Sequence, residues 1–357
     1  MAKKNSVKLK YVMTIPSVDF LNYVSIKDLI LLGSRDKRYQ DLKAQNPVLK
    51  QYLDSFKTIF GEKLNPSIVA RDESLPKVEP SQLCAFRNAV AIAGVIGSRV
   101  CSCLNNNQTT GFYCTDLFDF NPVSVSSDGT DLIARTPFEN SICCKVDDFI
   151  GQSTPSVIHP EHIIPAFDDK LMLALLDVVE NNYRTLNKKE FKTKVIRSME
   201  MAYYALRNPF LILGGQPDFG VQMSMWVSAF EVLANPYNDA GVHFTDVSAM
   251  IKAVPWMDKK LRLKKYAAVG SHKGHKATLP VQIYDRLYRT RNAYMHGNKM
   301  RKGEYEFHKR KGWGNLFFQI PALYRCDLMQ LLNSNGFGEF LVNSQEQKLY
   351  EKVLLSK

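Results

Sequence analysis

The sequence lacks any apolar run that approaches the roughly 20 residues needed to cross a bilayer. Its first residues, MAKKNSVKLK, lead into a strand-like segment rather than into the apolar stretch of a signal peptide. Internal repeats and low-complexity tracts are also missing from it. We therefore expect a globular protein that stays in the cytoplasm and makes no membrane contact.

The cysteines do not form a recognisable framework. There are seven, an odd number in a chain without a secretion signal, which favours reduced thiols over disulfides. Cys101, Cys103 and Cys114, or the adjacent Cys143 and Cys144, could ligate zinc, but two well-formed Cys-x2-Cys knuckles are missing. We therefore predict unligated thiols, no metal site and no cofactor.

The length of 357 residues, 45% of them hydrophobic and 23% charged, is enough for two domains with separate cores. Residues 1–165 alternate short strand-like runs (YVMTI, LIART, SVSS) with helical stretches such as Ser81 to Val95, which predicts a mixed α/β domain. Gly151 to Pro165 contains three prolines together with Ser and Thr, and we place the linker there.

From Asp168 onward the pattern predicts an all-α bundle over residues 166–357, with a basic insertion at 240–278 between its third and fourth helices. The first two helices should pair antiparallel. The third stops at Asn235, the fourth runs from Pro280 to Gly297 as its C′ residue, and the last spans about Pro321 to Leu332. The predicted core positions are Leu171, Leu173, Leu175, Leu176 and Val179 in the first helix, Phe191, Val195, Met199, Tyr203 and Leu206 in the second, Met223, Trp226, Phe230 and Leu233 in the third, and Ile283, Leu287 and Tyr294 in the fourth.

Positive charge is concentrated in one stretch. Trp256 to Lys311 holds 16 Lys or Arg against 4 Asp or Glu, a difference of +12 that equals the net charge of the whole chain. The remaining residues are therefore neutral by the same count. Such a distribution favours a polyanionic partner such as nucleic acid over a merely solvated basic surface.

The residues best suited to chemistry lie in RNAYMHG, at the end of the fourth helix. Asn292 and His296 are four residues apart and share a face, and Arg291, displaced by about 100°, must reach round to them. Arg289 lies seven residues before the histidine and returns to its face. An imidazole can exchange a proton near neutral pH and a guanidinium can stabilise a pentacoordinate phosphate, which predicts metal-independent RNA cleavage. The alternative is a histidine that only complements the helix dipole.

The segment YRTRNAYMHGN, preceded by a helix containing MWVSAFEVLAN, resembles the HEPN superfamily (higher eukaryotes and prokaryotes nucleotide-binding), and most of all its ApeA-like branch from bacterial anti-phage systems. The resemblance covers about residues 168–332. The family pattern of Arg, a polar residue and then His is matched by Arg291, Asn292 and His296, and Glu231 becomes a candidate for orienting Arg291 or the helix end. The resemblance implies a bundle that dimerises to form one composite site cleaving tRNA or other cellular RNA, in defence or toxin roles.

One departure bears on the biological role. In a toxin branch of the family the histidine is followed two residues later by tyrosine, whereas this chain has Gly297 and Asn298. Regulation through that tyrosine is not expected here. The departure favours anti-phage defence, or abortive infection, over a toxin–antitoxin system.

Two further basic segments flank the motif. The downstream segment KMRKGEYEFHKRKGWG mixes cations with aromatic residues, which suits phosphates and unpaired bases of RNA, although its aromatics could instead pack on the bundle. The run from Lys259 to Lys276 reads as supplementary electrostatic surface. The predicted RNA-binding residues are Arg289, Lys299, Arg301, Lys302, Lys309, Arg310 and Lys311.

We therefore predict a homodimeric endoribonuclease that cleaves tRNA or similar cellular RNA. His296 would act as general base or acid, Arg291 as the transition-state cation, Asn292 as an orienting group and Glu231 as its support. The first alternative is a non-catalytic RNA- or nucleotide-binding module that acts as a sensor or adaptor, and the second is a structural adaptor in which the motif only supports a dimer interface. Residues 1–165 are expected to have a sensing, regulatory or specificity role, with a phage-derived trigger or inhibitor as a further partner.

Overall fold

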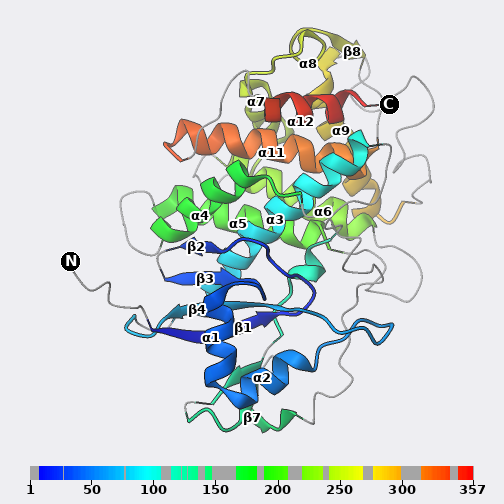
Figure 1. Ribbon diagram of the computed structural model, residues 1–357. Helices are drawn as coiled ribbons and strands as arrows, with labels where there is room; N and C mark the ends of the chain where they lie inside the picture. Colours follow the sequence, from blue (N-terminus) through cyan, green and yellow to red (C-terminus); the bar gives the residue numbers. More distant parts are fainter. Residues whose placement is uncertain are drawn as a thin grey trace. The chain divides into compact units, whose positions relative to one another are not determined.

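The computed structural model describes residues 8–26, 28–75, 78–105, 114–121, 123–126, 128–135, 141–146, 166–182, 189–207, 219–235, 241–267, 276–298, 315–337 and 345–356. The chain divides into two compact units. Unit 1 comprises Met1–Arg87 and Asp116–Ile163, and unit 2 comprises Asn88–Thr115 and Ile164–Lys357. Their elements are coloured along the sequence in Figure 1.

Unit 1 is built on an antiparallel sheet of order β1-β4-β3-β2. Two helices follow β3, and each begins at a side chain that caps it: Asp36 accepts a hydrogen bond from the Arg38 backbone, and Asn46 accepts one from Leu49. A second antiparallel sheet has the order β5-β6-β7. The bounds are β1 Leu9–Ile15, β2 Val24–Ile26, β3 Leu29–Leu32, α1 Lys37–Gln45, α2 Pro47–Asp54, β4 Ser67–Asp72, β5 Val123–Val125, β6 Leu132–Arg135 and β7 Ser141–Cys144, with a 3-10 turn at Thr115–Phe118.

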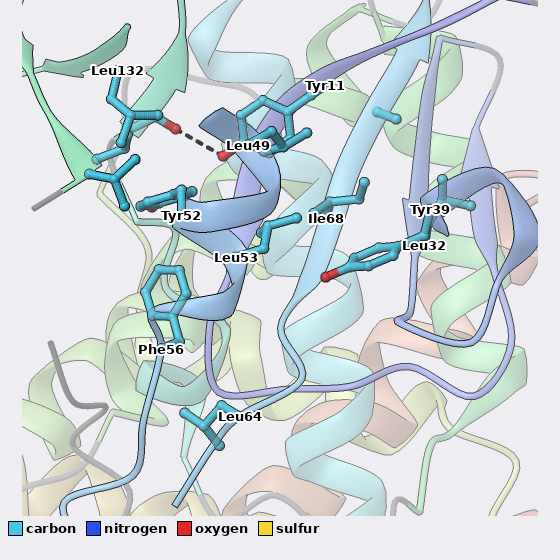
Figure 2. Packing of buried hydrophobic residues seen from close by; sticks show 13 residues of the cluster. Tyr11, Leu32, Tyr39, Leu49, Tyr52, Leu53, Phe56, Leu64, Ile68 and Leu132 are labelled. Atoms are coloured by element: carbon cyan, nitrogen blue, oxygen red, sulfur yellow. Dashed lines mark hydrogen bonds between the residues drawn. The ribbon is translucent and has the colours of Figure 1, made fainter. Parts of the chain in front are cut away.

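The core of unit 1 joins both sheets to α2 (Figure 2). Tyr52 from α2 and Leu132 from β6 lie in the same buried cluster as Ile68 from β4. The Tyr11 hydroxyl donates to the backbone oxygen of Val123 at 3.0 Å, which ties β1 to β5. The predicted mixed α/β character of the N-terminal part is confirmed.

Unit 2 is helical, as predicted for the C-terminal part. Its long helices pack around a cluster of aromatic rings. The Trp226 and Tyr324 ring centroids lie 5.3 Å apart, and Phe230 lies 5.3 Å from Tyr284 and 5.6 Å from Tyr324. The bounds are α4 Asp169–Asn182, α5 Lys189–Ala205, α6 Phe219–Ala234, α7 Phe244–Ala253, α8 Lys259–Arg262, β8 Lys265–Ala267, β9 Lys276–Thr278, α9 Leu279–Met295, α11 Leu316–Ser334 and α12 Gln345–Leu355.

The predicted core positions of the second and third helices are all buried in α5 and α6. In α4 one position was predicted wrongly, because the Leu173 side chain is 63% exposed. It follows Leu171 by two residues, about 200° round the helix, so it points away from the face that Leu171 and Leu175 bury. Tyr294 in α9 is only partly buried.

The last predicted helix begins earlier than expected. α11 begins at Leu316, where the Asn315 side chain accepts from the Phe317 backbone at 2.9 Å, and Pro321 lies inside it rather than at its start. Proline removes one helical hydrogen bond, but burial of Leu316, Ile320 and Leu323 favours the continuous helix. The sequence analysis did not predict α12 at all.

The apolar helix α3, Pro80–Leu104, has two features that were not predicted from the sequence. Among the described residues it is the one helix long and apolar enough to cross a bilayer, with an 18-residue window of mean hydropathy 1.3, but 89% of that window is buried inside the protein. Most of α3 belongs to unit 2, which includes the chain from Asn88 onward. The unit 2 fold thus recruits residues that the predicted division at 165 assigns to the N-terminal domain. The predicted linker, residues 151–165, lies outside the described residues.

Candidate functional site

The site is built on α6 and α9, which run antiparallel. Phe230 near the end of α6 meets Tyr284 in the first half of α9, and Gly220 at the start of α6 meets Tyr294 near the end of α9. A Cβ atom at Gly220 would overlap the Tyr294 ring, so only glycine permits this close approach. The C-terminal end of α9 is therefore held beside the start of α6.

The end of α9 is fixed by its backbone. The Gly297 N–H donates to the Tyr294 carbonyl at 3.0 Å, and the Asn298 N–H donates to the Ala293 carbonyl at 2.9 Å. These two bonds form a Schellman motif, with Gly297 in the left-handed region at φ +68°. The prediction of Gly297 as the C′ residue is confirmed. His296 is the C-cap residue, and its side chain is exposed.

Arg291 is held in place from two directions. One of its terminal nitrogens, Nη2, donates to Glu231 Oε1 at 2.9 Å, and its guanidinium carbon lies 4.8 Å from the centre of the Tyr288 ring. The side chains of Arg291 and Glu231 are 24% and 27% exposed, so neither is sealed inside the bundle. Glu231 thus contacts Arg291, the residue that it was expected to orient.

Glu231 lies in an environment that opposes its charge. Burial raises the pKa of the Glu231 carboxyl above its ordinary value, and the neighbouring Arg291 lowers it by less. Burial, and to a smaller extent the Glu231 charge, raise the pKa of the Tyr284 hydroxyl. The oxygen of this hydroxyl is buried without a hydrogen-bond partner among the described residues. The Phe244 ring from α7 packs against both tyrosines, with its centroid 5.6 Å from that of Tyr284 and 5.7 Å from that of Tyr288.

The sequence analysis missed this aromatic support. Tyr284 and Tyr288 precede Arg291 by seven and three residues, which places them on its side of α9. That spacing was available in the sequence, but a tyrosine at a helical core position carries no sign that it supports a cation. Phe244 could not have been found, because it comes from another helix.

The structure does not bring all the predicted residues together. Among the described residues, neither the His296 nor the Asn292 side chain has a hydrogen bond or ion pair, and none joins His296 to Arg291. Arg289 forms an ion pair with Asp285, one turn back along α9, at 2.9 Å. The six other predicted RNA-binding residues, between Lys299 and Lys311, lie outside the described residues.

The described part of the chain contains no group of three or more His, Cys, Asp or Glu side chains that could hold a metal ion. All seven cysteines are free thiols. Burial raises the pKa of Cys101 and of Cys103, whose sulfur lies 3.6 Å from the Ser356 hydroxyl. These thiols are therefore poor nucleophiles near neutral pH.

The geometry offers a fixed guanidinium that is paired with a half-buried carboxyl of α6, and an exposed imidazole at the C-terminal end of α9. A scan against protein-family models found no match, and searches of curated proteins and of solved structures found none either. Function must therefore be inferred from the residues themselves.

Proposed function

We propose that the protein is a metal-independent endoribonuclease of the HEPN type, acting as a homodimer on tRNA or similar cellular RNA in anti-phage defence. The observation that carries the proposal is how few of the Arg291 hydrogen-bond donors are already occupied. Only one of its five N–H groups has a partner among the described residues, so it is fixed in direction while donors remain for a phosphate. The resemblance of RNAYMHG to the ApeA-like branch supports the assignment.

The reaction needs only these side chains. The His296 imidazole takes the proton of a ribose 2′-hydroxyl, whose oxygen attacks the adjacent phosphorus. The bond from phosphorus to the 5′-oxygen breaks, and that oxygen receives a proton from an imidazolium. The products are a 2′,3′-cyclic phosphate and a 5′-hydroxyl end. Arg291 stabilises the negative charge on the pentacoordinate phosphate, and Glu231 keeps the guanidinium in place.

A second chain completes the proposed site. Because no contact joins His296 to Arg291 within the described part of one chain, His296 of one copy would act with Arg291 of the other. The two-fold axis would place two such His–Arg pairs, each a separate cleavage site, in the one composite cleft of the dimer. Mixing a His296→Ala chain with an Arg291→Ala chain would then regenerate one intact site in each hybrid dimer.

The test is cleavage of tRNA and total RNA in EDTA by wild type, each variant alone and an equimolar mixture refolded or co-expressed together. We expect neither variant to cleave and the mixture to recover about a quarter of wild-type activity, since about half of the dimers are hybrids with one site each. Arg35→Ala, at an exposed arginine of unit 1, is the matched control and should cleave like wild type. Undiminished cleavage by His296→Ala, or a requirement for divalent metal, would contradict the proposal.

A second candidate is a non-catalytic RNA-binding module. The ion pair between Arg291 and Glu231 favours it, because a guanidinium that serves only to join α9 to α6 would show the same contact. In that case RNA binding would weaken with salt, would survive both Arg291→Ala and His296→Ala, and would yield no cleavage products. The same set of proteins therefore distinguishes the two functions.

A further inference from the structure

We propose that α8, β8 and β9, residues 259–267 and 276–278, form a second RNA-binding surface that holds the phosphate backbone at a distance from the cleavage site. We call its described part the basic module. Six cations of the module are exposed: Lys259, Lys260, Arg262, Lys264, Lys265 and Lys276. The proposal rests on the ribonuclease function and specifies its substrate as RNA long enough to reach both places.

The charge of the module is not compensated locally. Among the described residues, none of the six cations forms an ion pair, and Lys264 instead lies 5.1 Å from the centre of the Tyr266 ring. The nearby carboxylates are engaged with backbone groups. Asp258 accepts from the Lys260 N–H at 2.6 Å, and Glu351 accepts from the N–H groups of Met257 and Asp258 at 2.8 Å each. Phosphates can therefore approach without displacing a protein carboxylate.

The module is attached rigidly to the bundle. Leu261, between the cations of α8, is fully buried, and the Gln282 side chain of α9 donates to the Tyr266 backbone oxygen at 3.0 Å. Glu351 of α12 holds the residues that precede α8. Figure 1 shows α8 and β8 next to α12, at the end of unit 2 where α9 starts. Fixed cations lose little conformational freedom on binding.

RNA fits the module better than a membrane surface. A helix that lies in a bilayer interface needs an apolar face to insert. The single turn of α8 has one apolar residue, Leu261, and that residue faces the bundle. Among the described residues of the module, Leu263 is the one large apolar side chain that is exposed beside the cations. A phosphate backbone needs nothing but the cations.

The spacing to the proposed cleavage site sets a length requirement. The module adjoins the start of α9, and His296 follows its last residue, so the two are separated by the length of this helix. Its 17 residues span roughly 25 Å at 1.5 Å per residue. With bases stacked at about 3.4 Å along a strand, roughly seven nucleotides cover that distance. A dinucleotide can therefore occupy the cleavage site but cannot reach the module.

The experiment compares three proteins on RNA oligonucleotides of two, four, eight, twelve and twenty residues. The module variant carries Lys259→Gln, Lys260→Gln and Arg262→Gln. The control variant loses the same charge from exposed lysines of unit 1, by Lys10→Gln, Lys37→Gln and Lys57→Gln. Each protein is made in two versions. Binding is measured by fluorescence anisotropy on the version with His296→Ala, and cleavage kinetics are measured on the version that keeps His296. Thermal unfolding verifies that all variants are folded.

We expect wild-type affinity to rise once the RNA exceeds about seven nucleotides and the module variant to lose that rise. A plot of the logarithm of the binding constant against the logarithm of salt concentration should become less steep by about 2 when three phosphate contacts are lost. If these contacts contribute nothing at 1 M salt, their loss lowers the affinity about 50-fold at 0.15 M salt. Affinity and KM for the shortest RNA should be unchanged, and the control variant should behave like wild type.

Equal affinity of module and control variants for the 20-mer would overturn the proposal, as would an equal loss for the shortest and longest RNA. Binding of the module to vesicles of anionic lipid, without binding of RNA, would overturn it in favour of a membrane. If the length dependence of binding is found but no protein cleaves, the basic module stands and the ribonuclease function fails.

Discussion

Asp327 in α11 provides a measurable test of the bundle interior. Its side chain is 1% exposed, and neither carboxyl oxygen has a hydrogen-bond partner among the described residues. Burial raises the pKa of this carboxyl well above its ordinary value, and no cation in the part of the chain that the structure describes opposes the effect. Asp327→Asn replaces it with a side chain of the same shape that cannot ionise in this range.

The sign of the effect follows from proton linkage. Because the pKa is raised in the folded state, the folded protein binds a proton that the unfolded chain releases above its own pKa of about 3.9. The contribution of Asp327 to stability is complete below the unfolded pKa and is lost as pH rises through the window up to the folded pKa. Each pH unit in that window costs wild type about 1.4 kcal/mol, a cost that Asp327→Asn does not have.

The assay is urea unfolding of wild type and Asp327→Asn at half-unit steps from pH 4 to pH 8. In the folded protein both side chains are neutral near pH 4, so the two free energies of unfolding should differ least there and should then diverge in favour of the variant as pH rises. Asp41→Asn is the control, because it makes the same chemical change at an exposed position of α1. Parallel curves for wild type and Asp327→Asn would refute the reasoning, since they would mean that Asp327 is solvated or paired.

Three further substitutions test contacts of the bundle. Gly220→Ala forces a Cβ into the Tyr294 ring and should lower the free energy of urea unfolding by about 1–3 kcal/mol. An equally large loss from Gly220→Ala in a Tyr294→Ala background would show that this contact is not the cause. Arg325→Met leaves the buried Asp168 carboxylate without the cation 2.7 Å away and should cost about 3–5 kcal/mol. Tyr350→Phe removes only a hydroxyl that donates to Asp168 at 2.6 Å and should cost less, about 1.5–3 kcal/mol, so equal losses would contradict the assignment.

The sequence was most informative where a helix has one buried face and clear ends. In α6 and α9, the apolar residues recur at helical spacing, and the structure buries Met223, Trp226 and Ile283 as expected. Gly297 marked the end of α9 because the left-handed conformation there favours a residue without a side chain. These features depend on residues close in sequence, so a local pattern could predict them.

The missed features depend on tertiary packing. Every residue of α3 from Asn88 to Val100 is buried, so the helix has no exposed face there whose pattern could show which unit covers it, and most of it belongs to unit 2. Pro321 predicted a helix start, yet burial of the flanking turns keeps α11 continuous. For the candidate site, helical spacing could place Arg291 near His296 in sequence but could not show that its guanidinium turns toward Glu231 and Tyr288.

That orientation of Arg291 bears on how the proposed site could bind a phosphate. A guanidinium paired with a fully ionised, well-solvated carboxylate would have to give up a favourable partner. Here burial raises the pKa of Glu231 even with Arg291 beside it, so the ionised carboxylate is poorly stabilised where it lies. Protonation of Glu231 as the singly charged phosphodiester approaches would therefore cost less than for an exposed glutamate. Arg291 would remain oriented by the Tyr288 ring while its positive charge becomes available to the substrate.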